Sequence, residues 1–76
     1  MDDLSKLSEE NSDRIMTIVE ELQPVTAREV REELARRYGL EVELEQLVRY
    51  MEWLRSGFPR KLVHAGPDAW GVVDLG

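Results

Sequence analysis

Four side chains of types that commonly form binding contacts recur at helical spacing in the second half of the chain: Gln46, Arg49, Tyr50 and Trp53. The i, i+3, i+4, i+7 spacing places all four on one face of a helix. Arginine and glutamine recognise guanine and adenine edges in DNA, whereas tryptophan, tyrosine and arginine are enriched at the energetic centres of protein interfaces. The pattern therefore predicts a binding face for one of these two classes of partner.

The opposite face of the same helix is apolar. Its residues are Leu44, Leu47, Val48, Met51 and Leu54. At about 100° per residue the apolar stripe centres near Leu44 and Met51, so the four polar and aromatic residues are expected on the solvent side. An alternative is that the segment containing Leu4 and Leu7, or the loop at Phe58, folds over that side and buries it.

Residue types suited to catalysis or metal binding are scarce. The chain has no cysteine and one histidine, His64, which leaves no basis for a disulfide, thiol chemistry or a nitrogen- or sulfur-ligated metal. No nucleophile and acid form a recognisable triad with His64, and the glycines match neither the P-loop nor the dinucleotide fingerprint. We expect no enzymatic activity, no cofactor and no metal.

Hydrophobic periodicity predicts three helices, at about residues 9–22, 26–38 and 43–56. Pro24 ends the first of them, because proline disfavours a helical residue before it. Thr26 and Glu29 have the spacing of a capping box at the start of the second helix, and Gly39 is its natural left-handed C-cap. Gly57 ends the third helix.

Two β-rich segments follow, at about residues 60–65 and 69–74, on either side of Gly66-Pro67-Asp68. A turn of this composition between two such segments is typical of a β-hairpin. The predicted cross-strand pairs are Ala65 with Ala69, His64 with Trp70 and Leu62 with Val72.

The charge is acidic and unevenly distributed. The formal net charge is −6, from ten Lys and Arg against sixteen Asp and Glu. Residues 1–24 hold seven acids and two bases, so most of the excess lies there. A protein that binds DNA attracts phosphates with a positive field, so DNA contacts in this chain would need a local basic patch. Glu41, Glu43 and Glu45, at the start of the third helix, would repel phosphates.

The 76 residues suffice for one small domain, which we assign to residues 11–76 after a flexible acidic segment at 1–10. The N-terminus lacks the basic and apolar regions of a secretory signal, and no run approaches the roughly 18–20 apolar residues of a membrane span. We expect a cytoplasmic protein that does not enter a membrane, either as a monomer or as a homodimer.

Three stretches together resemble a known family. They are Pro24–Val30 followed by Leu34, Met51–Phe58 followed by Leu62-Val63, and Trp70–Val73. Over about residues 12–75 the chain resembles the winged helix-turn-helix DNA-binding domain superfamily. The resemblance implies an α+β fold with a three-helix core followed by a C-terminal β-hairpin wing, and the third helix as the recognition helix in the major groove.

Two functions follow from the resemblance and the candidate residues. The first is a DNA-binding transcription regulator that contacts double-stranded DNA through Thr26, Arg28, Gln46, Arg49, Tyr50, Arg60, Lys61 and His64. In this hypothesis Thr26 and Arg28 meet phosphates, while Arg60, Lys61 and His64 act from the wing. The alternative is an acidic protein-interaction module, an adaptor or regulator of transcription or replication machinery, that uses Gln46, Arg49, Tyr50 and Trp53.

Overall fold

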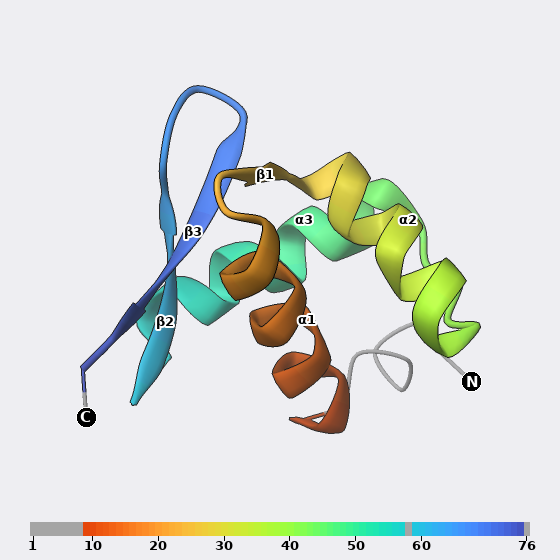
Figure 1. The fold of residues 1–76 in the computed structure, drawn as a ribbon, viewed down its shortest axis with the longest axis horizontal. Helices are drawn as coiled ribbons and strands as arrows, with labels where there is room; N and C mark the ends of the chain where they lie inside the picture. Colours follow the sequence, from red (N-terminus) through yellow and green to blue (C-terminus); the bar gives the residue numbers. More distant parts are fainter. Residues whose placement is uncertain (1–8, 58, 76) are drawn as a thin grey trace.

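The computed structural model describes residues 9–57 and 59–75, and the fold of this part is α+β (Figure 1). It contains three α-helices and a three-stranded antiparallel sheet in the order β1-β3-β2. The elements are α1 (Glu9–Leu22), β1 (Val25–Thr26), α2 (Ala27–Tyr38), α3 (Leu44–Trp53), the 3-10 turn η2 (Leu54–Ser56), β2 (Arg60–His64) and β3 (Ala69–Asp74). This arrangement is compatible with a winged helix.

The ends of α2 are fixed by the residues that the sequence indicates. The Glu29 amide donates to the Thr26 hydroxyl at 3.1 Å, and the Glu29 carboxylate accepts from the Thr26 amide at 3.0 Å, which confirms the capping box. Gly39 adopts a left-handed φ of 65° and its amide donates to the Ala35 carbonyl. Because β1 ends at the N-cap of α2, Thr26 belongs to both the sheet and the helix start.

The third helix is shorter than predicted. The α-helix ends at Trp53, and Leu54–Ser56 continue as a 3-10 turn that closes with the Gly57 amide donating to the Leu54 carbonyl. Before α3, Val42 is buried and its carbonyl accepts a 2.7 Å hydrogen bond from Nε of Arg31. This bond ties the connection between α2 and α3 to the body of α2.

The hairpin has the predicted register. His64 lies opposite Trp70 and Leu62 opposite Val72, while the Ala65 amide donates to the Ala69 carbonyl at 2.9 Å. The two-residue strand β1, which the hydrophobic pattern does not reveal, pairs Val25 with Trp70 on the other side of β3. It brings the start of α2 against the hairpin (Figure 1).

Gln23 continues the β1 edge beyond the strand itself. Its side-chain carbonyl accepts a 3.0 Å hydrogen bond from the Val72 amide, in place of a further residue of β1. A Cβ on Gly71 would lie only 2.9 Å from that oxygen, so the glycine leaves the room that Gln23 needs. Part of the β3 edge beyond β1 is thereby closed to another strand.

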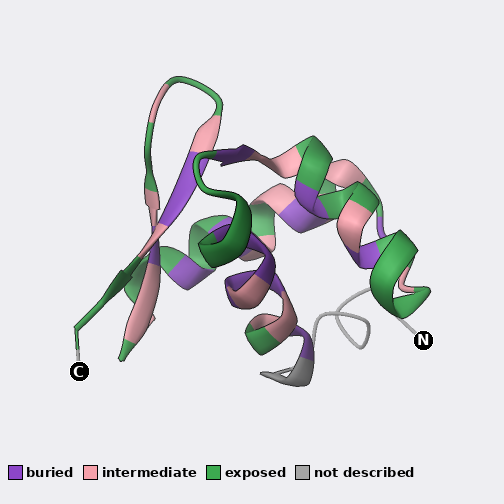
Figure 2. Ribbon diagram, viewed as in Figure 1, coloured by how far each residue is buried: buried purple, intermediate pink, exposed green. Residues whose placement is uncertain are grey.

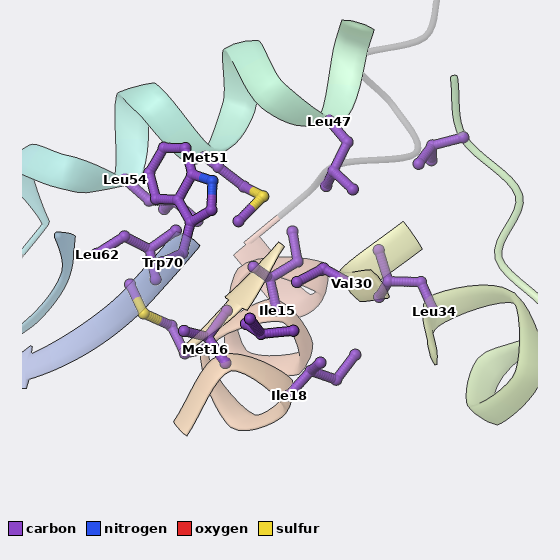
Figure 3. Close-up of a cluster of buried hydrophobic side chains, with 13 residues drawn as sticks. Ile15, Met16, Ile18, Val30, Leu34, Leu47, Met51, Leu54, Leu62 and Trp70 are labelled. Atoms are coloured by element: carbon purple, nitrogen blue, oxygen red, sulfur yellow. The ribbon is translucent and has the colours of Figure 1, made fainter. Parts of the chain in front are cut away.

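One core joins all the helices to the inner face of the sheet. Figure 3 shows the Trp70 indole beneath α3, beside Met51 and Leu54, with Leu62 close by. The buried apolar residues are Ile15, Met16, Ile18, Val19, Val25, Val30, Leu34, Val42, Leu47, Met51, Leu54, Leu62 and Trp70. The outer faces of the helices and the hairpin tip remain exposed (Figure 2).

Within the described ranges, no helix is both long and apolar enough to span a membrane. The predicted flexible segment at residues 1–10 falls mostly on residues 1–8, which lie outside these ranges.

Candidate binding surfaces

The apolar face of α3 is rotated from the predicted one. Leu47 and Met51 are fully buried and Leu54 nearly so, whereas Leu44, at the predicted centre of the stripe, is only half-buried. The reason is that α1 packs on the Tyr50 side of α3 and draws the core toward it. Glu45, Arg49 and Glu52 consequently occupy the most exposed side of the helix, with Trp53 at its edge.

Tyr50 and Trp53 differ sharply in burial although their rings are neighbours. Tyr50 is half-buried against the core, and its hydroxyl forms a 2.6 Å hydrogen bond with the Ser12 hydroxyl of α1. Trp53 is 65% exposed, and its ring centroid lies 5.5 Å from that of Tyr50. Of the two neighbouring rings, Tyr50 is therefore the one packed against the core, and Trp53 is the one exposed to solvent.

A hollow of about 250 Å³ opens beside Trp53. Its lining comes from α1, the end of α3, η2 and the start of β2: Ser12, Asp13, Met16, Trp53, Leu54, Ser56, Gly57, Pro59 and Arg60. Met16 and Leu54 are each 5% exposed and give it an apolar floor. We call Trp53 together with this hollow the Trp53 surface.

Arg60, whose guanidinium lines the Trp53 surface, forms ion pairs with two carboxylates of α1. Arg60 lies 3.3 Å from Glu20 and 3.8 Å from Asp13, and both carboxylates are more exposed than the arginine. Arg60, which the resemblance assigns to DNA contact, is thus held by two acids of α1. The rim carries two negative charges for one positive charge.

A second groove, of about 550 Å³, lies between the start of α2, α3 and the hairpin tip. We call it the His64 groove. It is lined by Thr26, Ala27, Arg28, Leu44, Val48, Glu52, His64, Pro67, Asp68 and Trp70. Nε2 of His64 lies 3.3 Å from the Glu52 carboxylate, and its ring centroid lies 4.3 Å from that of Trp70. His64 therefore joins the hairpin to α3.

Two neighbouring side chains, Arg55 and His64, favour the ionised form of Glu52. A 3.1 Å hydrogen bond from Arg55 is the main cause that lowers the pKa of Glu52, and the charge of His64 acts in the same direction, although partial burial opposes both. The groove therefore keeps a carboxylate at its α3 wall.

The net charge of the His64 groove is negative. Among the described residues its permanent cation is Arg28 and its carboxylates are Glu52 and Asp68, so the lining apart from His64 carries −1. Arg28 forms no ion pair with another residue of the described ranges. This single arginine is the strongest feature of the groove that would attract a phosphate.

The candidate residues are spread over several surfaces. Thr26, Arg28 and His64 meet in the His64 groove, whereas Trp53 and Arg60 line the hollow. Side chains alternate along a strand, so Lys61 points to the face of the hairpin opposite to that of Arg60 and His64.

Gln46 and Arg49 lie on α3 and line neither the hollow nor the His64 groove. Gln46 is half-buried and Arg49 is exposed. Arg49 lies one helical turn from both Glu45 and Glu52, so its positive charge has a negative neighbour on each side along the helix.

Sequence reasoning missed the α1 side of the Trp53 surface. Ser12, Asp13 and Met16 line it from a helix that the hydrophobic pattern presents only as packing. The one usable signal is Met16, an apolar residue next to Ile15 that widens the stripe of α1 toward a neighbour. The alternative cover, by Leu4 and Leu7 or by Phe58, lies outside the described residues.

No group of three or more potential metal ligands occurs in the part of the chain that the structure describes. Comparison of the chain with protein-family models, with curated proteins and with solved structures found no match.

Proposed function

We propose that the chain is a winged-helix module that binds a protein partner through the Trp53 surface. The observation that carries this proposal is the 65% exposure of Trp53 beside a hollow with an apolar floor. An indole in such a position buries a large area on binding, and side chains of this type dominate protein interfaces. The order of helices followed by a hairpin supports the winged-helix assignment.

Charge favours a protein over DNA as the partner. The surface that the resemblance assigns to DNA includes α3, whose exposed side carries Glu45 and Glu52 around Arg49. The His64 groove beside it has a net charge of −1. Phosphates approaching either feature would meet carboxylates as well as cations, and neutralising phosphates supplies a large share of the affinity for DNA. A protein partner has no such requirement.

Binding of double-stranded DNA is the second candidate function, and the position of Arg28 favours it. Arg28 is exposed at the start of α2, where Thr26 and His64 share its groove. A phosphate placed there would meet a guanidinium and a hydroxyl together. Regulation of transcription through DNA would have to rest on this small site and on Arg49.

Selection from a displayed library of random 16-residue peptides tests the proposed function. We expect peptides enriched on the wild-type chain to lose about thirty-fold or more in affinity for Trp53→Ala, because truncating the central residue of an interface costs about 2 kcal/mol or more. Arg28→Ala, in the His64 groove, is the control and should bind the same peptides as the wild type.

Two results would contradict the proposal. One is that no peptide is enriched on the folded wild-type chain. The other is that the enriched peptides bind Trp53→Ala as well as the wild type.

A further inference from the structure

The size of the Trp53 surface limits what can enter it. The hollow of about 250 Å³ is smaller than the roughly 300–1,000 Å³ typical of small-molecule sites. Its floor is formed by Met16 and Leu54, while its wall is the exposed Trp53 ring. These dimensions and this lining suit one bulky apolar side chain of a peptide segment.

The charges around the hollow select among such segments. Asp13 is 83% exposed and Glu20 is 55% exposed, and their one ion-pair partner among the described residues is Arg60. Arg55, two residues after Trp53, is paired with Glu52 at 3.1 Å and adds little free positive charge. An incoming segment therefore meets a rim that is negative overall.

A cation next to the apolar side chain would gain two contacts at this rim. It could pair with Asp13, whose only ion pair among the described residues is the 3.8 Å approach of Arg60. It could also lie on the exposed ring of Trp53, where a lysine or arginine is attracted to the face of an indole. Both contacts are lost if the flanking residue is neutral or acidic.

A second copy of the chain suits this surface poorly. A two-fold interface through Trp53 would bring the same acidic rim of both copies together, since each patch contacts its own equivalent. Each copy also carries a net charge of −6. Repulsion between the two acidic rims thus opposes self-association at this surface. The same negative charge attracts a basic partner.

We infer that the Trp53 surface takes a basic segment of a partner protein, in which a bulky apolar side chain fills the hollow and an adjacent lysine or arginine pairs with Asp13. This inference rests on the proposed function and adds the chemistry of the partner to it.

Three displayed peptide libraries test the inference. All three have the same randomised apolar positions at i, i+3, i+4 and i+7, and they differ only in the flanking residues, which are lysine, glutamine or glutamate. On the wild-type chain we expect enrichment to decrease in the order lysine, glutamine, glutamate. Enrichment of the glutamate library to the level of the lysine library would overturn the inference.

Two matched variants distinguish the effect of charge at the rim of the Trp53 surface from the effect of the net charge of the chain. Asp13→Asn removes a charge at the Trp53 surface, and Asp68→Asn makes the same change in the His64 groove. We expect Asp13→Asn to reduce the preference for lysine over glutamine peptides by about two- to five-fold, the scale of one exposed ion pair, and Asp68→Asn to leave it unchanged. Equal effects of the two variants would mean that only net charge matters, and the inference would fail.

The failure of the inference can be told apart from that of the proposed function. Peptides that depend on Trp53 but bind equally with lysine and glutamate flanks leave the proposed function intact and remove only the basic partner. If no peptide from any of the libraries depends on Trp53 for binding, both the inference and the proposed function fail.

Discussion

At the scale of single residues, the two tryptophans differ in burial and in the role that we assign to each. Trp70 is 4% exposed and packs under α3, so its indole belongs to the core. Trp53 is largely exposed, and its ring lies beside that of Tyr50. The proposed function therefore rests on Trp53 together with the apolar hollow beside it, because a single exposed apolar residue is common on protein surfaces.

The two tryptophans should therefore respond differently to truncation. We expect Trp70→Ala to lower the free energy of unfolding by about 3–5 kcal/mol, because it leaves a cavity in the core. Trp53→Ala should lower it by about 1 kcal/mol or less, chiefly through the lost ring contact with Tyr50. Urea unfolding of both variants measures the difference. A large loss of stability in Trp53→Ala would assign this residue to the fold instead of to binding.

At the scale of elements, local signals predicted local structure. The hydroxyl of Thr26 and the carboxylate of Glu29 define the start of α2 within four residues, and Gly39 defines its end, so no distant contact is needed. The hairpin register follows in the same way from the short turn between Ala65 and Ala69.

Features that depend on neighbours distant in sequence could not be predicted. Strand β1 is two residues long and exists because β3 pairs with it, so no periodicity reveals it. The rotation of the α3 core face likewise depends on where α1 lies, as the hydrogen bond between Ser12 and Tyr50 shows. The α1 side of the Trp53 surface was missed for the same reason.

The capping box offers a test at this scale. Thr26→Ala removes the hydroxyl that accepts from the Glu29 amide, and we expect a loss of about 1 kcal/mol, or a fall in Tm of about 4–8 °C. Thr26→Ser keeps the hydroxyl and serves as the control, with a Tm close to that of the wild type. Equal thermal stability of Thr26→Ala and Thr26→Ser would show that the box does not stabilise α2.

At the scale of the whole molecule, charge and shape point to the same class of partner. The acidic excess of the first 24 residues leaves the rest of the chain at −1. Among the described residues, the His64 groove contributes one arginine beside two carboxylates, and the exposed side of α3 contributes Arg49 between Glu45 and Glu52. The Trp53 surface adds an apolar hollow with an acidic rim. A basic partner protein would complement both the negative charge and the apolar hollow, whereas DNA would complement neither of them well.

A backbone-amide NMR titration tests this account most directly. One sample receives the most enriched lysine-flanked peptide, and a second receives mixed-sequence duplex DNA at about 50 mM and then about 200 mM salt. The account predicts that the peptide shifts the resonances of residues 12–16 and 53–57, and that DNA shifts neither these nor Arg28 and Arg49. Shifts at Thr26, Arg28 and Arg49 that appear with DNA and fade with salt, without any peptide effect at Trp53, would contradict it.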